Sequence, residues 1–97
     1  MERKNNATKL YFIIDQYLLG KMSAWDFCDE FHNLYNLNID YDTLSTIEQL
    51  IFNDLDDIVS RYTDIIEDLN NYPSVYYDER TLKQKVEESK LKLTTTN

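Results

Sequence analysis

Cys28 and His32 are the first candidates for chemistry, because they are the only cysteine and the only histidine of the chain. On a helix their i, i+4 spacing would bring the thiol and the imidazole to neighbouring positions, as a nucleophile and its general base require. Cys28, however, falls on the apolar face of its expected helix, where a cysteine usually behaves as a small hydrophobic residue. No glycine-rich turn lies nearby to hold an oxyanion, and no P-loop or dinucleotide fingerprint occurs. We therefore predict a protein that is not an enzyme.

Metal and cofactor chemistry is equally poorly supported by the residue types. Aspartates lie close together at 40–42 and at 54–57, but neither stretch continues with the glycine and the terminal glutamate of a calcium-binding EF-hand loop. One cysteine and one histidine cannot complete a tetrahedral zinc site. We expect no metal and no cofactor.

A group of acidic residues is the most unusual feature of the sequence. The group lies outside the apolar positions of the segment 43–69 and is opposed only by Arg61. Such runs are usually a solvated helix face, but a face built for solubility normally interleaves lysines, whereas like charges at i, i+4 repel by about 0.2–0.5 kcal/mol each. We therefore predict that these six acids bind a cationic partner: Asp54, Asp56, Asp57, Asp64, Glu67 and Asp68.

Overall charge supports the same choice of partner. The 97 residues carry 18 acidic and 10 basic side chains, a net charge of -8. Residues 10–78 alone contribute fourteen acids against Lys21 and Arg61, so this region sums to -12. Such a surface repels nucleic acid and anionic membranes, which argues against direct binding to either. With one cysteine, no recognisable export signal and no apolar run of about 20 residues, the sequence predicts a protein of the reducing cytoplasm.

Hydrophobic spacing predicts an all-α fold in a single domain, 1–97, with frayed tails at 1–8 and 94–97. One glycine and one proline are too few for a chain of hairpins. The first helix has an apolar stripe from Leu10 to Leu18 and stops at Gly20, and the second is capped by Ser23 and ends near Asn36. Short connections favour antiparallel neighbours, and hence a four-helix bundle.

The third and fourth helices follow from longer patterns. From Thr43 to Leu69 apolar residues recur every seven positions, which predicts one long helix with a kink or short break near 60–63, and with its apolar columns continuing through that point. Pro73 ends this segment. Asp78 then caps the last helix, whose expected buried face is Leu82, Val86, Ser89 and Leu93.

Three stretches together resemble a known family. Residues 17–27, YLLGKMSAWDF, resemble the opening helix-turn-helix of the colicin D-like bacterial immunity proteins, and residues from Tyr77 to Leu93 look like that family's last helix. Phe52 and the acids after it fall where the family has an apolar and acidic third helix. The similarity spans residues 10–93.

The resemblance implies a function. It implies an immunity protein that binds the basic nuclease domain of a tRNA-cleaving toxin and fills its RNA-binding cleft with carboxylates in place of phosphates. Such a protein would be a monomer alone and would bind its toxin 1:1. The positions most similar to the toxin-contacting ones of the family are Asp56 or Asp57, and Asp64.

Two other functions stay open at this point. An immunity protein against a membrane-permeabilising bacteriocin would carry a basic terminal helix, and residues 79–97 do sum to +2. An acidic adaptor or nucleic-acid mimic would use the same carboxylates as the toxin inhibitor. The neighbouring gene distinguishes the nuclease inhibitor from the bacteriocin immunity protein. A long toxin gene with a basic C-terminal domain supports the nuclease inhibitor, and a gene for a short cationic peptide supports the bacteriocin immunity protein.

Overall fold

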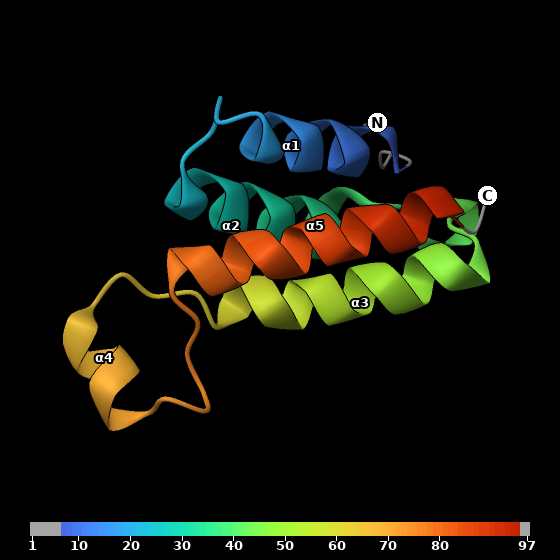
Figure 1. Cartoon of the computed structure of the whole chain (residues 1–97). Helices are drawn as coiled ribbons and strands as arrows, with labels where there is room; N and C mark the ends of the chain where they lie inside the picture. Colours follow the sequence, from blue (N-terminus) through green and yellow to red (C-terminus); the bar gives the residue numbers. More distant parts are fainter. Residues whose placement is uncertain (1–6, 96–97) are drawn as a thin grey trace.

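The computed structural model describes residues 7–95, and this part of the chain is helical without any strand (Figure 1). The all-α prediction is thereby confirmed, although the described residues form five α-helices where four were expected. Their bounds are α1 Thr8–Leu18, α2 Ala24–Asn33, α3 Thr46–Ser60, α4 Ile66–Asn71 and α5 Glu79–Thr95. A π-helical turn, Leu34–Asn38, extends α2, and a 3-10 turn, Tyr41–Thr43, precedes α3.

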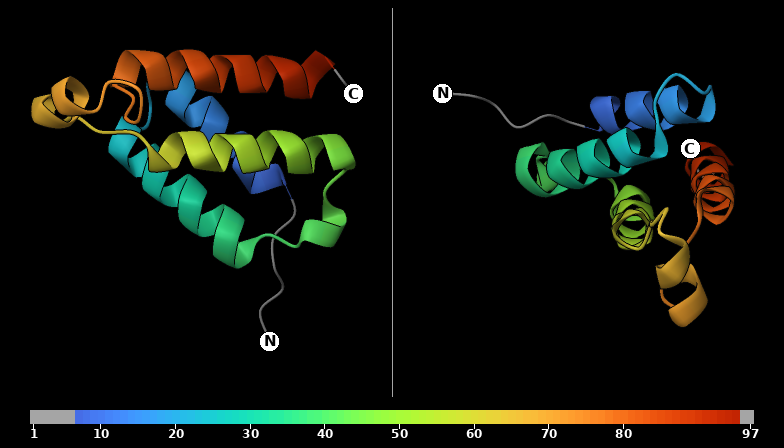
Figure 2. Two further views of the ribbon diagram at one scale, coloured as in Figure 1. Left: turned by 90° about the horizontal axis from the view of Figure 1, so that it is seen from below. Right: turned by 90° about the vertical axis from the view of Figure 1, so that its left-hand side faces the viewer.

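Four of these helices enclose the core. α3 packs on α2 and α5, and α1 also packs on α2 and α5, so that each of the four has two helical neighbours. Helices in contact point in opposite directions in space, and α1 and α2 are inclined to α3 and α5 (Figures 1 and 2). α4 lies outside this group, beyond the adjoining ends of α3 and α5.

Local signals place the ends of the first two helices. Gly20 has a φ of 77°, a left-handed conformation that glycine adopts without steric cost. Its N–H donates to the Tyr17 carbonyl at 3.0 Å and the Lys21 N–H donates to the Gln16 carbonyl at 2.9 Å, the paired bonds of a Schellman stop. The Ser23 hydroxyl then accepts the Asp26 N–H at 3.1 Å and starts α2, as its sequence predicts.

The later helices begin on equally local contacts. Asp78 accepts the Thr81 N–H at 2.8 Å, which confirms it as the cap of α5. The start of α3 differs from the prediction. It is set by a capping box, in which Ser45 accepts the Glu48 N–H at 3.1 Å and the Glu48 carboxylate accepts the Ser45 N–H at 2.8 Å, so the helix begins at Thr46 and not at Thr43.

Aromatic side chains fill the centre of the core. Phe52 of α3 is fully buried, with its ring 5.7 Å from that of Tyr11, 6.2 Å from that of Phe31 and 6.2 Å from that of Tyr35. These partners come from α1, α2 and the π-helical turn, so one side chain joins three segments. The expected buried face of α5 is also confirmed, at Leu82, Val86, Ser89 and Leu93.

The segment 43–69 was expected to be one long helix with a kink or short break near 60–63. The helix does stop there, but α3 ends at Ser60 and α4 begins only at Ile66, so the segment forms two separate helices and not one. The apolar columns do not continue through the break either: Ile58 is buried, whereas Ile65 is 52% exposed and Ile66 is 71% exposed. The chain turns outward here because the N–H of Tyr77 donates to the Arg61 carbonyl at 2.8 Å and the N–H of Thr63 donates to the Tyr77 carbonyl at 3.0 Å.

These two bonds define what we call the α4 excursion, residues 63–77, which leaves the four packed helices and returns at a neck formed by Arg61, Thr63 and Tyr77. Helix α4 lies within this excursion.

At the ends of the described chain the helices reach into the expected tails. Ala7 is buried, α1 begins at Thr8 and α5 continues through Thr95. The rest of the expected tails, residues 1–6 and 96–97, lies outside the described residues. No helix formed by residues 7–95 has the length and apolar character needed to cross a membrane.

We predict a pH-dependent contribution of Glu48 to stability. Its carboxylate accepts the Tyr11 hydroxyl at 2.7 Å as well as the Ser45 N–H. Burial acts to raise the pKa of Glu48, but the hydrogen bonds from Ser45 and Tyr11 outweigh it and lower the pKa. The stabilisation is therefore complete above the unfolded pKa of about 4.3 and is lost as the pH falls through the lower folded pKa.

Glu48→Gln should therefore reduce the free energy of unfolding by about 1 kcal/mol at pH 7, and by less at about pH 3. Urea unfolding followed by far-UV circular dichroism measures both values. Glu87→Gln, at an exposed position of α5, is the control and should change stability little at either pH. An equal loss for Glu48→Gln at the two pH values would contradict the role of the ionised carboxylate.

Candidate functional site

The structure does not bring Cys28 and His32 together as a nucleophile and its base. Cys28 is buried, and burial, with a smaller contribution from the charge of Asp29, raises the pKa of its thiol to about 12. The His32 ring instead contacts the helix opposite, where Nδ1 lies 3.1 Å from Oδ1 of Asp56. Cys28 is therefore a protonated core thiol at neutral pH, which agrees with the structural reading of its sequence position.

A shallow groove of about 260 Å³ runs between α2 and α3. Its volume is below the roughly 300–1,000 Å³ of pockets that hold drug-sized ligands, so it suits inserted side chains better than a small molecule. Cys28, Val59 and Tyr62 of its lining are buried, whereas its other lining residues are exposed. The lining residues are Trp25, Cys28, Asp29, His32, Val59, Ser60 and Tyr62.

Two of the predicted acids contact residues that line this α2–α3 groove. Asp56 accepts the side-chain amide of Asn36 at 3.2 Å besides its contact with His32. Asp64 accepts the indole N–H of Trp25 at 2.9 Å. Trp25 and His32 are seven residues apart on α2 and share one face, so Asp56 and Asp64 lie along the same strip of the protein surface.

Trp25 is the aromatic component of this site. Trp25 is 47% exposed, so the residue is partly open to solvent. The ring meets the Tyr62 ring edge to face, with centroids 5.0 Å apart. The indole is therefore fixed by Tyr62 and Asp64 while part of its surface faces solvent.

The other four predicted acids lie elsewhere, so the six do not form one face. Asp57 pairs with Arg61 at 3.2 Å on the outer side of α3, and Asp54 is also exposed there. Glu67 is exposed on α4. Asp68 accepts the hydroxyl of buried Thr63 at 3.1 Å. Asp54 and Asp57 differ from Asp56 because they lie on another side of the same helix, α3. The break between α3 and α4 separates the acids of α3 from Asp64, Glu67 and Asp68, because the helical register that would align them stops at Ser60.

Sequence reasoning missed Asp29 as a site residue. Asp29 lines the α2–α3 groove together with Trp25 and His32, the residues that Asp64 and Asp56 contact. A signal was present, since Trp25, Asp29 and His32 recur at i, i+4 and i+7 on the polar side of α2. That face looked solvated because nothing in the sequence indicated which helix lies next to it.

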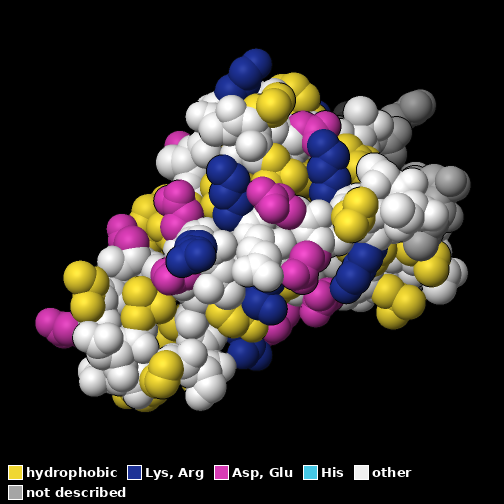
Figure 3. Space-filling model, in the orientation of Figure 1, with side chains coloured by type: hydrophobic (Ala, Val, Ile, Leu, Met, Phe, Trp, Pro, Cys, Tyr) yellow, Lys and Arg dark blue, Asp and Glu magenta, His cyan; other side chains and the backbone are white. Residues whose placement is uncertain are grey.

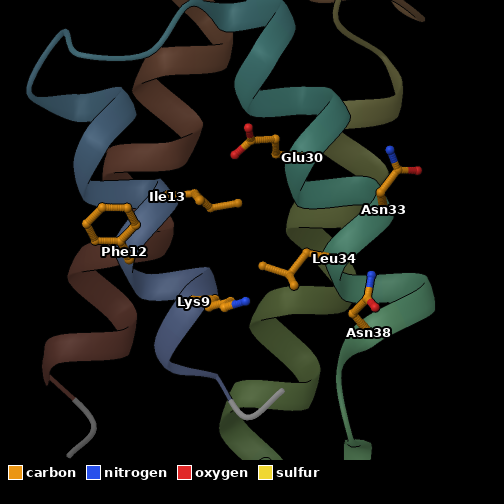
Figure 4. A pocket seen from close by; sticks show the side chains of 7 residues that line it. All are labelled: Lys9, Phe12, Ile13, Glu30, Asn33, Leu34 and Asn38. Atoms are coloured by element: carbon orange, nitrogen blue, oxygen red, sulfur yellow. The ribbon is translucent and has the colours of Figure 1, made fainter. Parts of the chain in front are cut away.

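A second and larger groove, of about 420 Å³, lies between α1 and α2 (Figure 4). It contains none of the six predicted acids. Its apolar lining is Phe12, Ile13 and Leu34, and its charges, Lys9 and Glu30, have opposite sign. This α1–α2 groove therefore has little preference for a cationic partner.

No protein-family model matches the chain, and neither a curated protein nor a solved structure matches it at a significant level. Within residues 7–95, no group of three or more His, Cys, Asp or Glu side chains is arranged to hold a metal ion.

We predict that the Cys28 thiol is nearly inert in the folded protein. A pKa raised to about 12 and a buried sulfur both suppress the reactive thiolate, so reaction with an aromatic disulfide reagent at about pH 8 should be slower than in the unfolded chain by at least about 100-fold. The release of the coloured thiol measures the rate. Ser60→Cys in a Cys28→Ala background is the matched control, because Ser60 lines the same groove but is exposed, and it should react fast. Rapid modification of Cys28 in the native protein would contradict the prediction.

Proposed function

We propose that this protein is an immunity protein that binds and inhibits the basic nuclease domain of a cognate tRNA-cleaving toxin. One observation supports this most directly: Asp29 lines a groove suited to inserted side chains, and Asp56 and Asp64 contact His32 and Trp25, two other residues of its lining. In this proposal α1, α2, α3 and α5 form an antiparallel four-helix bundle, α4 is an addition to it, and one copy binds one toxin in the cytoplasm.

The groove carboxylates are suited to receive lysine or arginine. Asp56 is already oriented by Asn36 of the π-helical turn and Asp64 by Trp25 of α2, so little side-chain freedom is lost when a partner binds. The exposed part of the Trp25 ring offers a cation–π contact beside them. A nuclease cleft that holds RNA phosphates presents cations at close spacing, and carboxylates in fixed positions satisfy the same cations.

Long-range charge favours the same class of partner. Residues 10–78 carry a charge of -12, which accelerates encounter with a basic protein and makes the association rate fall with added salt. The resemblance to colicin D-like immunity proteins supplies the specific choice of a tRNA-cleaving toxin. An acidic adaptor would share the electrostatics but would have no nuclease partner.

The bacteriocin alternative depends on the cations of α5. In Figure 3 lysine and arginine side chains lie across the middle of this face, and Lys83 and Leu91 of α5 are exposed. Other α5 cations are engaged within the protein, because Lys85 lies 5.0 Å from the centroid of the Tyr77 ring and Lys90 pairs with Asp15. The basic face is thus smaller than the charge of the helix suggests.

Charge reversal in the groove tests the proposal. Asp29→Lys with Asp64→Lys should leave the helical circular dichroism signal unchanged, because both side chains are exposed. The same pair should weaken binding to the nuclease domain encoded beside this gene by about 2–5 kcal/mol, and tRNA cleavage should no longer be inhibited. Biolayer interferometry and gel analysis of tRNA fragments measure the two effects.

Glu87→Lys with Glu88→Lys on α5 is the control, since it changes the net charge equally on exposed positions away from the groove. It should reduce the association rate moderately and keep inhibition. Loss of inhibition in the control with full inhibition in the groove pair would show that the binding face is wrong. Protection of cells from a pore-forming peptide in place of the nuclease would favour the bacteriocin alternative.

A further inference from the structure

The α4 excursion carries several large apolar residues that the core does not use, although Tyr77 at its neck packs against the core. Residues 63–77 stand apart from the packed helices in two perpendicular views (Figure 2). Ile65, Ile66, Tyr72 and Val75 are between 45% and 71% exposed. Figure 3 shows hydrophobic side chains gathered at this end of the molecule. An apolar surface of this kind on a small acidic protein marks an interaction site.

The excursion is held in a defined shape although it is outside the core. Its neck is closed by the backbone bonds at Tyr77, and buried Thr63 accepts the Ile65 N–H at 3.1 Å while its hydroxyl donates to Asp68. Further along, the Tyr72 and Tyr76 rings meet edge to face, with centroids 6.1 Å apart. A segment ordered in advance loses less conformational entropy on binding than a flexible loop.

Charge identifies the occupant of this surface. Residues 62–78 contain Asp64, Glu67, Asp68 and Asp78 and no lysine or arginine, a local charge of -4. A second copy of the chain would bring four carboxylates against four, and an anionic bilayer would repel them in the same way. A basic protein surface with an apolar patch is complementary to both the charge and the exposed side chains.

We propose that the α4 excursion is a second docking element, which packs Ile66 and Val75 against an apolar patch bordered by lysine or arginine on the partner. This rests on the proposed function, in which that partner is the nuclease domain bound at the α2–α3 groove. The two elements have different physical roles. The groove acids accelerate encounter, whereas apolar contacts desolvated in the complex slow dissociation. Asp64 joins the two, because it belongs to the excursion and contacts Trp25 of the groove.

The test compares two pairs of serine substitutions at exposed apolar residues, one pair in the α4 excursion and one pair outside it. Ile66→Ser with Val75→Ser should raise the dissociation rate of the nuclease domain at least about ten-fold and change the association rate less than about two-fold. The control is Leu50→Ser with Leu91→Ser, at positions 63% and 64% exposed on α3 and α5, and it should leave both rates nearly unchanged. Hydrogen exchange of the complex should show protection within residues 63–77.

Each other outcome overturns the inference in a recognisable way. If the nuclease domain binds the wild-type protein and dissociates from both variants at the wild-type rate, the excursion is not a docking element and the proposed function stands. If the domain does not bind the wild-type protein, both proposals fail. A concentration-dependent dimer in sedimentation that Ile66→Ser abolishes would make a second copy the occupant, and binding to anionic vesicles lost in the same variant would make it a membrane.

Discussion

The burial of Phe52 is the interaction that holds α3 against α1, α2 and the π-helical turn. Its ring contacts Tyr11 of α1, Phe31 of α2 and Tyr35 of the π-helical turn, so one residue of α3 fixes the positions of three segments from elsewhere in the chain. Nearby, Glu48 joins the start of α3 to α1 through the Tyr11 hydroxyl. Because α2 and α3 are held together in this way, the polar faces that flank their contact form the α2–α3 groove.

The C-terminal end of α3 determines which residues of the next segment are exposed at the surface. The Tyr77 N–H donates to the Arg61 carbonyl and closes the neck of the α4 excursion. Helix α4 therefore lies outside the four packed helices. Residues with a helical core pattern, such as Ile65 and Ile66, consequently face solvent. The same break rotates Asp64 away from the register of Asp57 and towards Trp25.

Acidic side chains on this protein therefore differ in what they can do. Asp57 is already paired with Arg61, and Asp68 accepts the Thr63 hydroxyl, so both serve local structure. Asp56 accepts the amide of Asn36 and Asp64 accepts the indole N–H of Trp25, and both lie beside residues that line a groove on the surface. Oriented carboxylates beside a partly exposed indole are a favourable arrangement for arginine or lysine from a partner.

Sequence alone determined what depends on neighbours within a few residues. The Gly20 stop, the Ser23 and Asp78 caps and the buried faces of α1 and α5 follow from hydrogen bonds and apolar spacing within one helix. Tertiary structure decided where the heptad columns of 43–69 stop and which acids share a groove. Both depend on contacts between residues far apart in sequence, Arg61 with Tyr77 and Trp25 with Asp64, and no local pattern encodes them.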